Sequence, residues 1–156
     1  MPVELRPVTA KNWLELTKLQ TREDQKSFVS SNVFSIAESQ FGYDEPDYGH
    51  WDFYPFGIYD DDVAVGFLMY GFNFEHPEQQ AFIARLMVDE KFQGKGYGRV
   101  GMKKMLEIFR ADERIKDVAI SYEPENEVAQ KLYASIGFVE PGEMVGDETL
   151  AVLKLR

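Results

Sequence analysis

Cysteine is absent from the 156-residue sequence, and histidine occurs only at His50 and His76. Without cysteine the chain can form no disulfide and can offer no thiolate to a metal. Two histidines are too few for a histidine-rich metal site. We therefore expect no metal centre, and the lack of cysteine fits a reducing compartment.

Long apolar runs are absent as well. The first twenty residues carry charges at positions 4, 6, 11, 15 and 18, so they lack the apolar core of a signal peptide. The longest charge-free stretch in the middle of the chain, residues 63–74, is short and broken by glycines, so it does not predict a membrane span. We expect one domain over residues 1–156, located in the cytoplasm and without a membrane partner.

Positive charge is scarce and unevenly placed. The formal net charge is −10, which argues against nucleic acid as a partner. No Lys or Arg lies between Lys26 and Arg85, and this segment favours a cationic ligand, with a solvated acidic surface as the alternative reading. Its ten acids are Glu38, Asp44, Glu45, Asp47, Asp52, Asp60, Asp61, Asp62, Glu75 and Glu78.

A glycine-rich turn lies between an apolar strand expected at 81–88 and an amphipathic helix that continues to Phe109. Glycine at positions 94, 96 and 98 lets the backbone approach a large anion, and the unpaired N–H groups at the start of a helix attract negative charge. Lys91, Lys95 and Arg99 add positive charge around the turn. The pattern predicts a phosphate site, and an ordinary glycine-rich loop is the alternative.

Two well-known nucleotide folds do not fit this turn. Residues 96–101 match the dinucleotide fingerprint G-x-G-x-x-G by letter, but several expected strands precede the turn and too little chain follows it for a Rossmann fold. A P-loop is excluded because no Gly-Lys-Ser/Thr follows at the required spacing. A phosphate group is still expected, held by another fold.

Hydrophobic periodicity predicts an α/β (α+β) protein with the order β-α-α-β-β-β-α-β-α-β-β. Thr9 and Asn32 are the expected N-caps of the first two helices, and Gly42 the expected end of the second. Residues 43–52 read as an aromatic and acidic loop. Strands are expected at 3–8, 53–59, 63–74, 81–88, 117–121, 138–139 and 149–155. Helices are expected near 13–16, at 33–41, from the glycine turn to 109, and at 127–136.

Two motifs resemble one superfamily. Gln93-Gly94-Lys95-Gly96-Tyr97-Gly98 resembles the Q/R-x-x-G-x-G/A pyrophosphate loop of the GCN5-related N-acetyltransferase (GNAT) superfamily. Downstream, Asn126-Glu127-Val128-Ala129, Leu132-Tyr133 and Gly137-Phe138 resemble its N-x-x-A-x-x-x-Y-x-x-x-G-F helix, whose inner face we expect to include Val128. The resemblance implies a mixed, mostly antiparallel sheet of about seven strands with about four helices, and acetyl-CoA as acetyl donor.

Several residue roles follow from this resemblance alone. The backbone of Leu86, Met87 and Val88 would hold the pantetheine arm, and Asn126 would contact that arm, with a plain helix cap as its alternative role. Tyr133 would donate a proton to the CoA sulfur, with a core tyrosine as the alternative. The diphosphate would bind the N–H groups of Gln93, Gly94, Lys95, Gly96, Tyr97, Gly98 and Arg99.

The acceptor is less defined. Residues 56–59, 65–71 and 88–98 resemble bacterial spermine/spermidine (diamine) N-acetyltransferases, which together with the acidic segment implies a polycationic small-molecule amine. Protein N-termini, aminoglycosides and a non-catalytic CoA- or polyamine-binding sensor are the alternatives. The strand before the turn carries Arg85 and no carboxylate, so we expect a water relay to a general base elsewhere, with Glu38, Asp52 or Glu75 as candidates. Glu38, Trp51, Asp52 and Glu75 are the candidate acceptor contacts, and a homodimer is a further expectation.

Overall fold

The computed structural model describes residues 2–26, 28 and 30–156. Its strands are β1 (Val3–Pro7), β2 (Tyr43–Glu45), β3 (Gly49–Asp60), β4 (Val63–Phe72), β5 (Ala81–Val88), β6 (Asp117–Tyr122), β7 (Met144–Val145) and β8 (Glu148–Lys154). Its α-helices are α1 (Trp13–Thr17), α2 (Asn32–Phe41), α3 (Tyr97–Arg110) and α4 (Glu127–Ile136), and two short 3₁₀ helices are η1 (Glu23–Gln25) and η2 (Glu90–Phe92).

The eight strands form one sheet in the order β1-β3-β4-β5-β6-β8-β7, and β2 pairs with β3 outside this path. All pairs are antiparallel except β5 with β6, which are parallel. The predicted α+β class with a mostly antiparallel mixed sheet is therefore confirmed.

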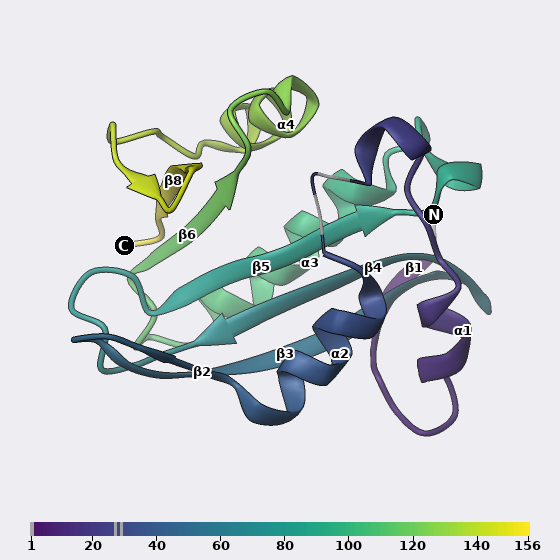
Figure 1. Cartoon of the computed structure of the whole chain (residues 1–156), viewed down its shortest axis with the longest axis horizontal. Coiled ribbons are helices and arrows are strands. Elements are labelled where there is room, and N and C mark those ends of the chain that lie inside the picture. The colour runs from purple at the N-terminus through teal and green to yellow at the C-terminus, as the bar shows by residue number, and fades with distance from the viewer. Residues whose placement is uncertain (1, 27, 29) are drawn as a thin grey trace.

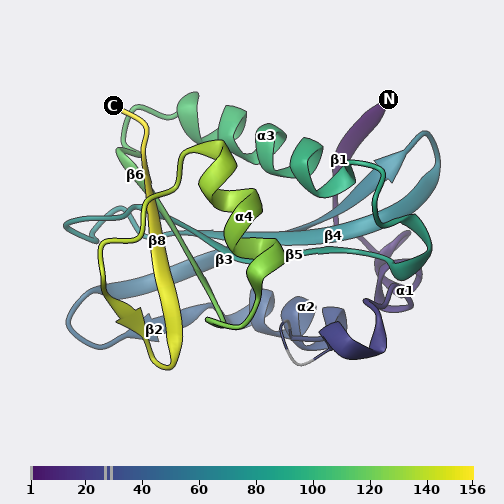
Figure 2. The ribbon, with the colours of Figure 1, turned by 90° about the horizontal axis from the view of Figure 1, so that it is seen from above.

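Helices cover both faces of the sheet. Figure 2 shows α3 and α4 on one face and α1 and α2 on the other. Burial explains this arrangement, because alternate residues of β4 join different apolar clusters. Leu68 packs with Phe109 of α3, whereas Phe67 packs with Leu16 of α1. Strand β4 is thus buried on both faces and forms the centre of the molecule.

The two central strands β5 and β6 separate along their length, as Figure 1 shows. In the described chain they pair only from Ala81 with Val118 to Ile83 with Ile120. On the other side of β5, Met69 pairs with Arg85 and Tyr70 with Ile83, so Ala84 is a β-bulge. A bulge bends its strand. Residues 84–88 consequently diverge from β6 and leave that edge of β5 without a strand partner among the described residues.

Residues 43–52 are not a loop, and that prediction was wrong. Strands β2 and β3 form a hairpin in which Tyr43 pairs with Trp51 and Glu45 with Gly49. The turn contains Asp47 and Gly49, both with positive φ. Acidic residues have low strand propensity, which hides an edge strand from a propensity argument.

The predicted strand at 138–139 was also wrong, because in the described chain these residues contribute only a single bridge from Val139 to Val152. The N–H groups of Gly137 and Phe138 donate to carbonyls of α4, at Ala134 (3.1 Å) and Tyr133 (3.0 Å), in a Schellman motif. Phe138 is therefore still part of the helix cap. The strand that pairs with β8 at this edge is β7, and β8 itself begins one residue earlier than predicted.

Helix α2 differs from its prediction in cap and orientation. Ser31, not Asn32, is the N-cap, and its hydroxyl accepts from Phe34 N–H at 3.1 Å. The buried residues of the helix are Asn32 and Ser35, whereas the large apolar residues Val33, Phe34 and Phe41 are exposed. The inner face is polar because Asn32 donates to the carbonyl of Leu16 at 2.9 Å. Gly42 ends the helix as expected.

The N-cap of α4 is the predicted residue, whereas that of α1 is not. Asn126 caps α4, as predicted, by accepting from Ala129 N–H at 3.2 Å. Asn12, rather than Thr9, occupies the N-cap position of α1. Its side chain makes no capping bond and instead accepts from Thr9 N–H at 2.8 Å in the preceding turn. Val128 was expected on the inner face of α4 but is exposed, since it lies in the first turn, beside the cavity described next.

Candidate active site

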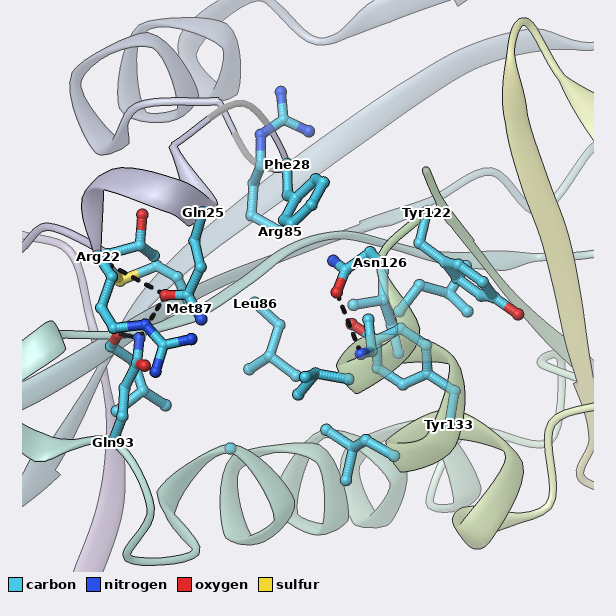
Figure 3. Close-up of a pocket in the computed structure, with 18 of the residues that line it drawn as sticks. Arg22, Gln25, Phe28, Arg85, Leu86, Met87, Gln93, Tyr122, Asn126 and Tyr133 are labelled. Atoms are coloured by element: carbon cyan, nitrogen blue, oxygen red, sulfur yellow. Dashed lines mark hydrogen bonds between the residues drawn. The ribbon is translucent and has the colours of Figure 1, made fainter. Parts of the chain in front are cut away.

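The gap between β5 and β6 holds a cavity of about 970 Å³ (Figure 3). Strand β5 forms one wall and α4 with β6 the other, while η1 and the glycine turn close one end. Most of the residues predicted to bind the cofactor line it: Leu86, Met87, Val88, Gln93, Gly94, Gly96, Tyr97, Gly98 and Asn126. Tyr133 lines it as well. The strand, the turn and the downstream helix therefore meet at one site.

The glycine turn is built to leave backbone groups free. Gly94 and Gly96 have φ values of 79° and 88°, which L side chains rarely adopt. Gly96 is the N-cap of α3, and because it has no side chain it cannot cap the first N–H groups of the helix. Those N–H groups lie at the positive end of a 14-residue helix, a favourable place for phosphate.

The space around these glycines fits a phosphate group lying against the backbone. A Cβ added at Gly94 would meet no atom within 4 Å, and one at Gly98 would meet only Val88 Cγ2 at 3.7 Å. Packing within the protein therefore does not demand glycine at position 98. Gly101 is different, because an added Cβ would lie 3.0 Å from Ile58 Cδ1, the close packing expected for a glycine inside a helix.

The cationic side chains of the turn are not all directed to the cavity. Lys95 lies over the ring of Phe92, and Arg99 donates to the Ser135 hydroxyl at 2.9 Å. Neither lines the cavity, whereas Arg22, which the sequence did not single out, does. The signal for Arg22 was weak, since it lies in a polar stretch far from the glycine motif.

Gln93 fixes the end of β5 to the segment that covers the cavity. Its side-chain amide donates to Gln25 Oε1 at 2.8 Å and to the Val88 carbonyl at 3.0 Å. Figure 3 shows Gln93, Gln25 and Arg22 grouped at one end of the cavity. The side chain of Gln93 thus positions the turn, while the backbone of the turn faces the ligand space.

Two tyrosines lie next to each other on the far wall, and within the described part of the chain only the Tyr122 hydroxyl has a hydrogen-bond partner. The Tyr122 hydroxyl donates to Glu140, and Figure 3 shows it pointing away from the cavity. Tyr133 packs 5.5 Å from the Tyr122 ring and 6.0 Å from the Phe138 ring. Burial raises the pKa of Tyr133 to about 12, so it is protonated at neutral pH. Tyr133 is both a core residue and a cavity residue.

The acceptor residues predicted from the sequence do not line the cavity. Trp51 is buried, and its indole N–H donates to Glu45 at 2.9 Å. Asp52 is exposed beside His50, because it alternates outward from Trp51 on β3. Glu75 lies in the loop after β4, where its N–H donates to Asn73. The structure does not bring these three residues to the site.

Glu38 reaches the site only through Arg85. The guanidinium of Arg85 donates to Glu38 at 3.1 Å, to Ser35 Oγ at 3.0 Å and to the Ala84 carbonyl at 2.7 Å. Burial lowers the pKa of Arg85, and the carboxylates of Glu38 and Glu148 oppose this shift. Arg85 also lines the cavity, so β5 presents to it an arginine that is paired with Glu38 and no carboxylate.

Glu148, the first residue of β8, lines the cavity opposite β5 and was missed by the sequence prediction. Its carboxylate accepts from the Ser121 hydroxyl at 2.7 Å. The only signal was the alternating pattern of residues 148–154, which extends the strand by one residue. Nothing in the sequence places that residue beside Arg85.

Replacing Glu38 with glutamine is expected to lower the free energy of unfolding by about 2 kcal/mol, because it leaves the largely buried Arg85 guanidinium without its counter-ion. Urea denaturation at pH 7 measures this. The matched control is Glu23→Gln, which breaks an exposed ion pair with Lys26 and should leave the free energy of unfolding nearly unchanged. Equal effects of the two substitutions would contradict the structural role of Glu38.

Two further features of the described residues bear on the site. No helix among residues 2–26, 28 and 30–156 is long and apolar enough to cross a membrane. Within the same residues no group of three or more His, Cys, Asp or Glu side chains is arranged to hold a metal ion.

The model of the acetyltransferase (GNAT) family matches residues 13–138. A spermine/spermidine N(1)-acetyltransferase of Bacillus subtilis is 27% identical over 148 residues, covering 92% of each chain.

Solved structures share the fold. A spermidine N-acetyltransferase from Vibrio cholerae, in complex with CoA and spermine, superposes with a TM-score of 0.73 at 16% identity, over 99% of this chain and 96% of that one. A PaiA N-acetyltransferase from Thermoplasma acidophilum, in complex with coenzyme A, gives a TM-score of 0.68 at 16% identity, over 99% of each chain. At these identities the likeness establishes the fold alone.

Proposed function

The chain belongs to the acetyltransferase (GNAT) family, and from that premise we propose that it transfers an acetyl group from acetyl-CoA to a primary amine of a polyamine such as spermidine or spermine. The donor follows from the family. The choice of a polyamine as acceptor is the proposal.

The observation that carries the proposal is the charge of the cavity wall. Arg22 and Arg85 are the only Lys or Arg residues that line it among those described, and Glu38 neutralises Arg85. The carboxylates that line it are Asp24, Glu90, Glu125, Glu127 and Glu148. An acidic cavity attracts and orients a cation, and a polyamine presents several ammonium groups at once. The name of the B. subtilis relative agrees with this choice.

The donor would occupy the cavity from the glycine turn towards the middle of β5. The N–H groups from Gln93 to Arg99 would hold the diphosphate, and the free edge of β5 at Leu86, Met87 and Val88 would bind the pantetheine arm. The Asn126 side chain both caps α4 and lines the cavity, so a cap and a ligand contact are compatible roles.

The chemistry requires a neutral amine, a polarised carbonyl and a proton for the leaving sulfur. An amine of pKa about 10.4 costs about 4.6 kcal/mol to present in its neutral form at pH 7. A backbone N–H near Met87 would polarise the thioester carbonyl. The Tyr133 hydroxyl would donate the proton to the sulfur, since its high pKa keeps it protonated.

The acceptor is tested with a panel of amines at fixed acetyl-CoA. We expect kcat/KM for spermidine or spermine to exceed that for aminoglycosides and for peptides with a free N-terminus by at least about tenfold, because only a polyamine places several cations against the acidic wall. The KM for the polyamine should rise with ionic strength. A higher kcat/KM for a peptide or an aminoglycoside would overturn the choice of acceptor.

Two expectations from the sequence belong to this proposal. A cytoplasmic location fits the absence of cysteine. The homodimer stays a prediction, and sedimentation or light scattering would measure it.

A further inference from the structure

Glu148 is a carboxylate on the cavity wall that forms no salt bridge among the described residues. The hydrogen bonds of the Arg85 side chain go to Glu38 and Ser35 of α2 and to the Ala84 carbonyl, although the charge of Glu148 also acts on Arg85. The polar partner of Glu148 is the neutral hydroxyl of Ser121 at 2.7 Å. A bond from a neutral hydroxyl fixes the position of a carboxylate without cancelling its charge. Glu148 therefore presents a positioned negative charge to the cavity.

Glu148 lies on the face of the sheet opposite α3 and α4. In β6, Ile120 and Tyr122 belong to the apolar cluster of α3 and α4, so the alternate residue Ser121 faces the other way. In β8, Ala151 and Leu153 belong to that same cluster, so Glu148 shares the orientation of Ser121. Arg85 bonds to α2 on this face too. Glu148 and Tyr133 thus lie on opposite faces of the sheet. The gap between β5 and β6 opens from one face to the other.

This separation suits an acetyl transfer to an amine. The group that receives a proton from the attacking nitrogen and the group that gives one to the leaving sulfur serve different atoms, so one group on each side of the reacting carbonyl can serve both. Strand β5 supplies no carboxylate between Ala84 and Val88. Glu148, across the gap, is a cavity-lining carboxylate whose side chain lies on the face opposite Tyr133.

We propose that Glu148 binds the ammonium group of the acceptor and accepts its proton. This inference rests on acetyl transfer to an amine and not on the identity of that amine. Arg85 would limit how far the acceptor enters, and Ser121 would hold the carboxylate in place. Further charged groups around the cavity are Arg22 and Asp24 near η1, Glu90 in η2, and Glu125 and Glu127 near the start of α4.

The proton balance is complete. One ammonium proton passes to Glu148, and the freed lone pair forms the C–N bond to the acyl carbon as the C–S bond breaks. The sulfur takes the proton of Tyr133. The second nitrogen proton and the proton on Glu148 leave to water, and Tyr133 regains one from water. The turnover releases one proton, as acetylation of an ammonium ion by a thioester requires.

The test is Glu148→Gln, which keeps the size of the side chain and an oxygen that accepts from Ser121. At pH 7 we expect kcat/KM for spermidine to fall about 30-fold, with the KM for acetyl-CoA unchanged, because the lost charge acts only on the amine. For the wild type, kcat/KM for spermidine should be independent of pH between pH 7 and 9. The kcat/KM of Glu148→Gln should rise with pH in that range, because the variant needs an amine that is already neutral. The difference in kcat/KM between the wild type and the variant should therefore narrow towards pH 9.

Asp147→Asn is the matched control, since it removes a neighbouring carboxylate that is exposed in the same hairpin and does not line the cavity. It should leave the profile unchanged. Ser121→Ala should give a smaller loss with the same pH signature, and thermal melting of each variant reports folding.

Parallel pH profiles for the wild type and Glu148→Gln, or an unchanged kcat/KM, would overturn the proposal. If the panel finds a better acceptor than spermidine, the same comparison is made with that amine. A retained effect of Glu148 with such an amine would refute the polyamine acceptor while supporting the role of Glu148.

Discussion

Tyr133→Phe is expected to lower kcat about 200-fold and to leave the dissociation constant of CoA within about threefold. A positioned general acid contributes roughly 10²- to 10⁴-fold, and the lower part of that range applies because a thiolate of pKa near 8.5 leaves moderately well without help. Phenylalanine keeps the ring contacts to Tyr122 and Phe138, so binding and folding should persist.

The pH dependence follows from the burial of Tyr133, which raises its pKa to about 12. The hydroxyl stays protonated in the folded protein while an unfolded tyrosine ionises near pH 10, so its contribution to folding stability is constant below pH 10 and is lost as pH rises from about 10 to 12. We therefore expect no loss of kcat from ionisation of Tyr133 below about pH 10.

Tyr70→Phe is the matched control for Tyr133→Phe. Tyr70 is also buried, and burial raises its pKa to about 12, but it lies in β4 away from the cavity lining. Its replacement should leave kcat within about twofold. A kcat of Tyr133→Phe within threefold of the wild type would assign Tyr133 to packing alone.

Gly98→Val is expected to raise the dissociation constant of CoA about 100-fold without destabilising the fold. Gly98 lies in the first turn of α3, where a Cβ would meet only Val88 Cγ2 at an ordinary 3.7 Å, so the protein has room for the first atom of a side chain there. The larger side chain would instead fill the space at the N–H groups of the turn. Losing about two charge-assisted hydrogen bonds to phosphate, each worth about 1.5 kcal/mol, accounts for a change of this size.

Titration calorimetry with CoA measures this effect, and urea denaturation measures the stability. Gly98→Ala should give an intermediate loss of affinity. Ala111→Val adds comparable bulk at the other end of α3, outside the cavity, and should change the affinity less than twofold. Normal CoA affinity in Gly98→Val would show that the turn is an ordinary strand-to-helix loop.

Local patterns predicted the donor side of the site because its signals are continuous in sequence. The strand Ala81–Val88, the glycine turn and the cap at Asn126 each carry backbone requirements that particular residue types meet, and all three are where they were expected. The structure also brings them to one cavity. Their roles towards the donor stay predictions until binding is measured.

The acceptor side could not be predicted because it depends on how distant strands are placed. The bulge at Ala84 bends β5 away from β6, and no residue type announces a bulge. Ser35 and Glu38 of α2 bond to Arg85 of β5, and Glu148 lies in the last strand, β8. The acidic acceptor candidates were selected because they lie in a segment without Lys or Arg. Charge alone does not show whether a residue lines the cavity or lies on the exposed β2–β3 hairpin, as Asp52 does.

The most direct measurement is the stoichiometry of acetyl transfer. The purified protein is incubated with acetyl-CoA and spermidine, the free thiol is titrated, and the amine is analysed by mass spectrometry. We predict one acetylated spermidine for each CoA thiol released, at a rate that Tyr133→Phe lowers about 200-fold. Binding of CoA with no acetylation of spermidine or of any other amine in the panel would contradict the account.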